Sequence, residues 1–246
     1  MASQTAKKQG PTDTLAGYLW PSKSVPDPAS HIVDLRDLRL DTAHALVAQA
    51  SGSEAALRRD QPSRYLQGLI DGLCELSLKD HLTGLANRRH FRAVLEREID
   101  RVTRSGEAAL LLMLDIDHFK EINDAYGHTV GAEVIRALAH VVRGNVRAGD
   151  CAGRFGGDEF AIVLPGMHAC DALAIAQRIR EQTEGVRLRS LPELRITSSI
   201  GVAPADHRHS SLRAWIDAAD AALYVAKNGG RNQVAGCMEP ALVPAV

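Results

Sequence analysis

The sequence predicts an α/β fold, in which a central sheet is flanked by helices and preceded by an N-terminal helical segment. After residue 80, short apolar runs that suit buried strands alternate with longer segments of helical periodicity. A Gly-Gly pair joins two of these strand-like runs, as in a tight hairpin. The composition is that of a globular protein, because 45% of the 246 residues are hydrophobic and 24% are charged.

Charge and composition exclude several classes of protein. Lys and Arg number 29 and Asp and Glu 30, a formal net charge of −1, so binding of a nucleic acid polymer through bulk charge is not expected. The four cysteines are scattered without CxxC spacing, which argues against a disulfide scaffold or a zinc ribbon. The longest apolar run, residues 108–114, is too short for a membrane span, and no signal peptide is apparent. We therefore expect a cytoplasmic protein.

The N-terminal part is predicted to consist of a flexible tail and a helical segment. Residues 1–30 are rich in proline and lack apolar periodicity, which indicates the tail. Residues 31–79 have helical periodicity from residue 31 to about 56 and again near their end, and they suit a regulatory or dimerising segment. Near that end, four leucines follow spacings of three, four and three: Leu66, Leu69, Leu73 and Leu76. This is a coiled-coil seam of two heptads, although a core-facing amphipathic helix has the same spacing.

Residues 80–238 are predicted to form the main domain, with helices and strands in alternation. The predicted helices are residues 89–104, 128–145, 169–184 and 211–227. The predicted strands are residues 109–114, 151–155, 160–164 and 195–202, with a short last strand near residue 233.

The first motif with chemical potential is Asp115-Ile116-Asp117, which follows the apolar strand 109–114. Carboxylates at positions i and i+2 of a strand share one face. Oxygen ligands on such a rigid base suit a hard cation such as Mg²⁺. Alone, the pattern fits equally well a strand end capped by solvated acids.

The second motif is Gly156-Gly157-Asp158-Glu159, between two apolar strands. The glycines permit positive φ in a two-residue hairpin, which leaves the two acids at its shoulder, facing the first strand. Acids from two adjacent strands that converge on one point form the usual arrangement for metal-assisted phosphoryl transfer. The alternative is an ordinary hairpin with solvated acids.

Two further stretches contain side chains suited to a nucleotide. Lys120 and Asn123 follow the first motif, where an ammonium can neutralise phosphate and an amide can pair with a base edge. Lys227 and Arg231 flank a second Gly-Gly pair near the C-terminus and suit phosphate binding.

Together these stretches resemble the GGDEF domain of bacterial diguanylate cyclases. The resemblance covers residues 77–236 and consists of five motifs in order: Asp80–Arg89, Leu114–Asp124, Tyr126–His128, Gly156–Phe160 and Asp220–Asn232. It implies the palm-like fold of nucleotidyl cyclases. It also implies a nucleotidyltransferase that condenses two GTP into cyclic di-GMP plus pyrophosphate, across a homodimer in which each domain holds one GTP.

The resemblance implies roles for individual residues. Two Mg²⁺ ions per active half-site, with Mn²⁺ as an alternative, would be held by Asp115, the Ile116 carbonyl, Asp158 and Glu159. Asp158, Glu159 and Lys120 would be catalytic, with Asp158 accepting the proton of the 3′-hydroxyl. The substrate-binding residues would be Phe119, Lys120, Asn123, His128, Gly156, Gly157, Lys227 and Arg231.

A second site is implied by Arg147-x-x-Asp150, which lies shortly before the Gly-Gly hairpin. In the family, an RxxD pattern at this offset binds the product as an inhibitor, and Arg178 matches an additional arginine of that site. A guanidinium can stack on guanine and bind phosphate, and a carboxylate can pair with the guanine edge. We expect noncompetitive inhibition by cyclic di-GMP.

One position departs from the family pattern. Ala132 stands where the family has an aspartate that contacts the guanine edge, and its methyl group cannot accept a hydrogen bond. This substitution favours two alternatives to a strict diguanylate cyclase. One is a cyclase with relaxed purine selectivity, and the other is a degenerate GGDEF receptor that binds GTP or cyclic di-GMP.

Overall fold

The computed structural model describes residues 40–51, 61–205 and 211–236. The predicted tail lies outside these residues, as do both ends of the helix expected from residue 31 to about residue 56. The described part of that helix is α1, Asp41–Ser51. Helix α2 spans Pro62–Leu78, with proline in its first turn, where the missing backbone N–H costs no hydrogen bond.

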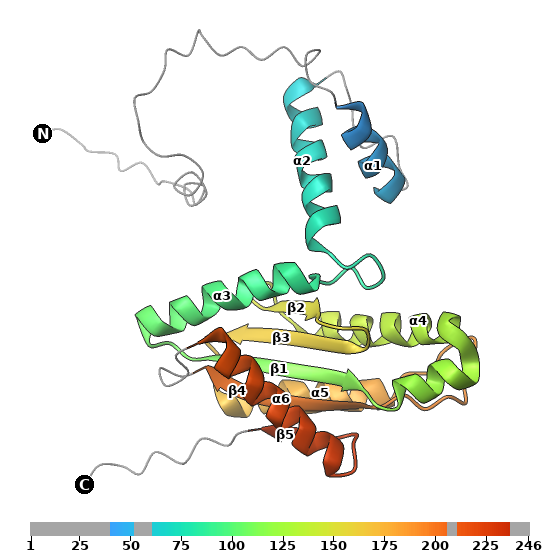
Figure 1. The fold of residues 1–246 in the computed structure, drawn as a ribbon, viewed down its shortest axis with the longest axis vertical. Helices are drawn as coiled ribbons and strands as arrows, with labels where there is room; N and C mark the ends of the chain where they lie inside the picture. The colour runs from blue at the N-terminus through green and yellow to red at the C-terminus, as the bar shows by residue number, and fades with distance from the viewer. Residues whose placement is uncertain (1–39, 52–60, 206–210, 237–246) are drawn as a thin grey trace, which may run out of the picture. The chain divides into compact units, whose positions relative to one another are not determined.

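The predicted α/β fold is confirmed, and Figure 1 shows its sheet and helices. The helices after α2 are α3 Arg88–Ser105, α4 Phe119–Asn145, α5 Ala169–Glu184 and α6 Leu212–Asn228. The strands are β1 Ala109–Ile116, β2 Cys151–Arg154, β3 Glu159–Pro165, β4 Ser198–Ala205 and β5 Val234–Gly236. The sheet order is β2-β3-β1-β4-β5, and only the β4–β5 pair is parallel.

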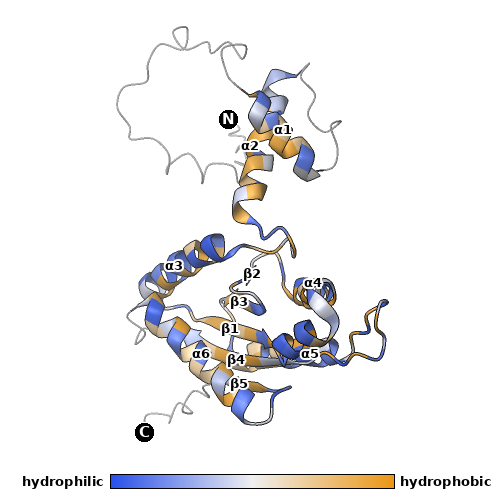
Figure 2. Ribbon diagram, turned by 45° about the vertical axis from the view of Figure 1, so that its right-hand side comes forward, coloured by the Kyte–Doolittle hydropathy of each residue, from blue (hydrophilic) through white to orange (hydrophobic). Residues whose placement is uncertain are grey.

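Strand β1 is central and buried along its whole length, because both faces of the sheet are covered by helices. Leu110, Leu112 and Leu114 pack in a core that includes α4 and α5. Leu111 and Met113 alternate with them and pack in a second core with α3 and α6. The apolar strands between the two helical layers are visible in Figure 2. This double burial makes the C-terminal end of β1 a rigid base for polar groups.

Two elements differ from the sequence prediction by more than two residues at a boundary. Helix α4 begins at Phe119 rather than near residue 128, and a break at Gly127 with φ 80° and ψ 164° interrupts it. The first part of α4, before Gly127, is helical because Ile122 within it is buried in the first core. Strand β4 runs from Ser198 to Ala205, so residues 195–197 precede it.

The predicted reason for the Gly-Gly hairpin is wrong. Neither Gly156 nor Gly157 has positive φ. The backbone N–H groups of Phe155 and Gly156 both donate to the Glu159 carbonyl, at 2.8 and 3.2 Å. A Cβ atom at Gly156 would lie 2.2 Å from Glu159 Oε2. A side chain at Gly156 would therefore displace the Glu159 carboxylate, while the backbone conformation of Gly156 itself does not require glycine.

The described residues add two observations on composition. Cys74, Cys151 and Cys170 are all free thiols. Among the helices of the described segments, none is both long and apolar enough to cross a bilayer.

Candidate nucleotide and metal site

Three acids lie close together at the C-terminal end of β1, where it pairs with the start of β3. Asp115, the penultimate residue of β1, lies directly opposite Glu159 in the antiparallel register. The Ile116 amide donates to the Asp158 carbonyl at 3.4 Å, which continues the pairing by one step. Asp115 is 8% exposed, whereas Glu159 is exposed and Asp158 is half-buried. The acids predicted to converge therefore come from neighbouring positions of two strands.

A lysine from α6 approaches the same point. Lys227 Nζ lies 2.8 Å from Asp115 Oδ2, although the two residues are far apart in the sequence. Burial raises the pKa of the Asp115 carboxyl, and the negative charges of Asp158 and Glu159 raise it further, while Lys227 partly offsets the shift. The site thus holds more negative charge than its lysine balances, which favours an added cation.

Asp220 is a further acid that the sequence analysis did not select. Burial raises its pKa, and so does the charge of Glu159, while Lys227 lowers it. Asp220 lies seven residues before Lys227 on α6, which places both on the same helical face. That spacing is the signal that would have identified it.

The donor set fits Mg²⁺ or Mn²⁺. All the acids at this point offer hard oxygen ligands, which these ions prefer. Within the described parts of the chain, no three acid, histidine or cysteine side chains form a complete metal cage by themselves. Magnesium commonly takes one or two protein carboxylates and completes its shell with water and substrate phosphates. An incomplete cage at this edge is therefore the arrangement expected for an ion that arrives with a nucleotide.

The remaining predicted substrate residues lie on α4 and after α6. Lys120 is exposed in the first turn of α4, and Phe119 beside it is half-buried against the core. Asn123 lies against Gly131 across the helix break, where a Cβ atom would be 2.0 Å from its Oδ1. His128 is exposed just after the break. Arg231 is exposed in the turn after α6, with φ 62°.

Asp117 does not join Asp115, although both belong to the same motif. It is 4% exposed and accepts hydrogen bonds from Thr197 Oγ1 at 2.8 Å, Ser199 Oγ at 2.6 Å and the Asn232 amide at 3.0 Å. The expectation that both carboxylates face a cation is therefore wrong for Asp117, because its oxygens already have three donors.

Arg154 stabilises the hairpin at residues 156–159. Arg154 donates from Nε and Nη2 to the Gly157 carbonyl, at 3.1 and 2.6 Å, and from Nη1 to Asp80 Oδ2 at 3.3 Å. Burial opposes ionisation of Asp80, but hydrogen bonds from Thr83 and the charge of Arg154 outweigh it and hold the pKa of Asp80 below its usual value. This chain of contacts links the turn after α2 to the hairpin at residues 156–159.

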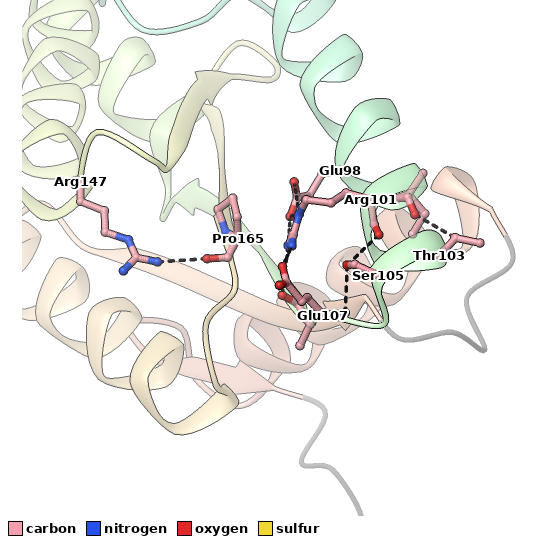
Figure 3. A network of polar contacts seen from close by, with 9 residues as sticks. Glu98, Arg101, Thr103, Ser105, Glu107, Arg147 and Pro165 are labelled. Atoms are coloured by element: carbon pink, nitrogen blue, oxygen red, sulfur yellow. Dashed lines mark hydrogen bonds and ion pairs between the residues drawn. The ribbon is translucent and has the colours of Figure 1, made fainter. Parts of the chain in front are cut away.

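The predicted inhibitory site is located apart from these acids in the sequence, between α4 and β2. Arg147 donates from its amide and from Nε to the two Asp150 oxygens, at 2.9 and 3.1 Å. Its Nη2 donates to the Pro165 carbonyl at 3.0 Å, as Figure 3 shows. The Asp150 side chain is only 2% exposed. Arg178 donates to Asn145 Oδ1 at the end of α4, two residues before Arg147.

Comparison with known proteins gives a consistent result. The profile of the family described as "Diguanylate cyclase, GGDEF domain" matches residues 77–233. The "Probable diguanylate cyclase DgcC" of Escherichia coli K12 is 44% identical over 158 residues, which are 64% of this chain and 43% of that protein. The "Response regulator PleD" of Caulobacter vibrioides is 39% identical over 183 residues, 73% of this chain and 40% of that protein. The chain thus spans about two fifths of the length of these curated relatives.

Solved structures give the same match. The GGDEF domain of DgcB from Caulobacter crescentus, solved in complex with c-di-GMP, is 37% identical with a TM-score of 0.62, and covers 65% of this chain and 95% of that one. A second structure, the coiled coil and GGDEF domain of the same protein, is 33% identical with a TM-score of 0.67. That match covers 78% of this chain and 100% of the solved one.

Proposed function

Because the chain belongs to the GGDEF domain family, as its match over residues 77–233 shows, we propose that it is a diguanylate cyclase. It condenses two GTP into cyclic di-GMP and releases two pyrophosphates. In each half-reaction, the 3′-oxygen of one GTP forms a bond to the α-phosphorus of the other, and the bond from that phosphorus to the pyrophosphate breaks. The observation that carries the proposal is the pairing of Asp115 with Glu159, with Lys227 Nζ 2.8 Å from Asp115.

Each charged group has a role in this reaction. Asp115, the Ile116 carbonyl, Asp158 and Glu159 would hold two Mg²⁺, with Mn²⁺ as an alternative. When bound, these ions would supply positive charge to offset that of the triphosphate. Asp158 accepts the proton of the attacking hydroxyl. The basic side chains that bind phosphate oxygens are Lys120, Lys227 and Arg231.

The nucleotide is held by residues on α4 and the hairpin. Asn123 contacts the base, with His128 in the same pocket, while Phe119 packs beneath them. The backbone at Gly156 and Gly157 lies close to the phosphates. The support for the pocket is the position of Asn123 beside Gly131 at the break in α4.

Ring closure requires two domains that face each other, so the active form is a homodimer. Helix α2 is the proposed dimer surface, within a regulatory segment at residues 31–79 that precedes the catalytic domain at residues 80–238. Leu69 is buried, but Ile70, Leu73 and Leu76 are 54%, 37% and 46% exposed on α2. Exposed apolar side chains on one helix favour pairing with a second copy.

The Arg147–Asp150 pair and Arg178 form the site for cyclic di-GMP as inhibitor. Arg147 already holds Asp150, so its guanidinium is oriented before the ligand binds. We expect Arg147→Ala to relieve product inhibition while the initial rate is retained. The measurement is the initial rate against added cyclic di-GMP, and unchanged inhibition in the variant would count against this assignment.

Ala132 favours a second candidate, a cyclase with relaxed purine selectivity. Its methyl group is half-buried on α4, and the next carboxylate, that of Glu133, is already bonded by the Ser190 hydroxyl. Loss of a guanine-edge contact weakens rejection of adenine, by about tenfold or more. Retained acids and lysines argue against the third possibility, a degenerate receptor of GTP or cyclic di-GMP.

One experiment separates the three candidates. Purified full-length protein is incubated with Mg²⁺ and GTP, ATP or both, and the products are identified by mass spectrometry. Cyclic di-GMP alone supports the main proposal, a mixed or adenine-containing product supports the second, and binding without product supports a receptor. Ala132→Asp is the matched variant, because it should restore strict use of GTP if the second candidate holds.

A further inference from the structure

The buried carboxylate of Asp117 connects three separate parts of the chain. Its Oδ1 accepts from Ser199 in β4, and its Oδ2 accepts from Thr197 just before β4 and from the backbone of Asn232 after α6. The donors lie 80, 82 and 115 residues away in the sequence. A buried carboxylate requires such donors, because an unsatisfied charge at 4% exposure would be strongly destabilising.

The segment that Asp117 contacts has an unusual backbone. Gly230, Arg231 and Asn232 have φ of 116°, 62° and 45°, so two consecutive non-glycine residues lie in the left-handed region. Such a residue is strained and persists only where other contacts fix it. Arg231 N donates to the Ala226 carbonyl at 3.2 Å, and Asn232 N donates to Asp117 at 3.0 Å. These contacts hold the turn in a conformation that it would not favour alone.

We infer that Asp117 is a positioning residue, which fixes the turn at residues 229–232 against the end of β1 and thereby orients Arg231. This inference rests on the proposed function for the role of Arg231 toward phosphate. Asp117 itself holds no metal, since its two oxygens already accept three hydrogen bonds. The two carboxylates of the D-x-D motif therefore have different roles, with Asp115 at the proposed metal site and Asp117 at the turn.

Asp117→Asn tests this role with little change in shape. An amide has one acceptor oxygen in place of two and carries no charge, so at least one of the three donors loses its acceptor and the bonds that remain are weaker. Because hydrogen bonds to a charged group are worth more than neutral ones, we expect KM for GTP to rise about tenfold while kcat changes less than about threefold. Ser199→Ala is the matched control, because it removes a bond to Oδ1 and leaves Oδ2 bonded to the turn.

A measurement on the turn itself requires no catalytic activity. Hydrogen–deuterium exchange of residues 229–233 should be faster in Asp117→Asn than in the wild type or in Ser199→Ala. Equal exchange in all three proteins would overturn the inference, even if the chain made no cyclic di-GMP. If cyclic di-GMP is absent but exchange changes as expected, the proposed function fails and the positioning role stands.

A double-mutant cycle shows whether Asp117 acts through Arg231. Binding of a non-reactive GTP analogue is measured by calorimetry for Asp117→Asn, Arg231→Ala and the combined variant. If Asp117 orients Arg231, its substitution has no further effect once Arg231 is truncated. Additive losses would contradict the inference. If Asp117→Asn does not fold, Thr197→Val tests the same oxygen in a milder way, with a smaller loss in the same direction.

Discussion

Asp115 and Asp117 lie two residues apart at the end of β1, but their carboxylates have opposite surroundings. Asp115 faces the hairpin with Asp158 and Glu159, and an ion pair with Lys227 balances only part of their charge. Asp117 faces the turn after α6 and accepts three hydrogen bonds from neutral donors. Asp80 belongs with Asp117 in this comparison, because Thr83 and Arg154 satisfy it.

The difference separates the acids that we propose to hold metal from the acids that stabilise the fold. A carboxylate with unsatisfied charge attracts a metal ion, and its neighbours keep that charge unfavourable until the ion arrives. A carboxylate with all its donors in place contributes stability, and it loses that contribution when a donor is removed. Substitutions on the two sides should therefore change different measured quantities.

The largest effect is expected at Asp115, the carboxylate whose negative charge is only partly balanced. Asp115→Asn removes the carboxylate that both Lys227 and the metal require, so turnover of GTP should fall by roughly 10²- to 10³-fold. The free energy of unfolding at neutral pH should not fall, because burial and the nearby acids make the ionised Asp115 unfavourable. Initial rates and urea unfolding check the two parts. A variant that loses stability along with activity would break the comparison.

A stability effect is expected at Asp80, whose carboxylate has its hydrogen-bond donors in place. Asp80→Asn leaves Arg154 without its carboxylate, and the free energy of unfolding at neutral pH should fall by about 1.5 to 3 kcal/mol, the usual contribution of a hydrogen bond to a charged group. Arg92→Met is a suitable control, because Arg92 pairs with Glu96 on the exposed face of α3, where an ion pair contributes little to stability. The change should be measured by urea unfolding of both variants. Loss of activity at full stability in Asp80→Asn would contradict this assignment.

The Asp80 effect has a defined pH dependence. Its pKa is lower in the folded protein than the ordinary value of 3.8, so the ionised form stabilises the fold at every pH above that value. This contribution is lost as the pH falls through the lowered pKa. The difference in unfolding free energy between the wild type and Asp80→Asn should therefore be constant near neutral pH and shrink below pH 3.8.

The sequence predicted the elements whose causes are local. The run at residues 109–114 lies within β1 because continuous apolar residues suit a strand buried on both faces. The helix at residues 169–184 coincides with α5. The approach of the hairpin acids to that strand was also predicted, and the structure adds the register, in which Asp115 lies opposite Glu159.

Features that depend on distant residues were not predicted. The donors to Asp117 are a threonine, a serine and a backbone amide, residue types that give no signal in a sequence, and they lie 80 or more residues away. The Glu159 carboxylate packs against Gly156, whose φ is not positive, and residue identity alone does not show which of these two features a glycine serves. The early start of α4 depends on the burial of Ile122 by the core.

The smallest effect concerns the ion pair at the unsatisfied side. Lys227 Nζ lies 2.8 Å from Asp115 Oδ2. The ammonium therefore occupies a place beside the carboxylate that a bound metal ion would need. Lys227→Met removes the competing ammonium, so affinity for Mn²⁺ without nucleotide should rise by about tenfold, equivalent to ~1.4 kcal/mol. Turnover should still fall, because the phosphate loses a contact. Electron paramagnetic resonance of free Mn²⁺ measures the affinity.

Lys120→Met is the matched control for that measurement. Lys120 is exposed on α4, and its removal takes no ammonium from Asp115. It should lower turnover through the lost phosphate contact and leave the Mn²⁺ affinity of the free protein unchanged. Equal Mn²⁺ affinity in Lys227→Met and Lys120→Met would mean that Lys227 does not compete with the metal. The unsatisfied charge of Asp115 would then be balanced only when nucleotide is bound.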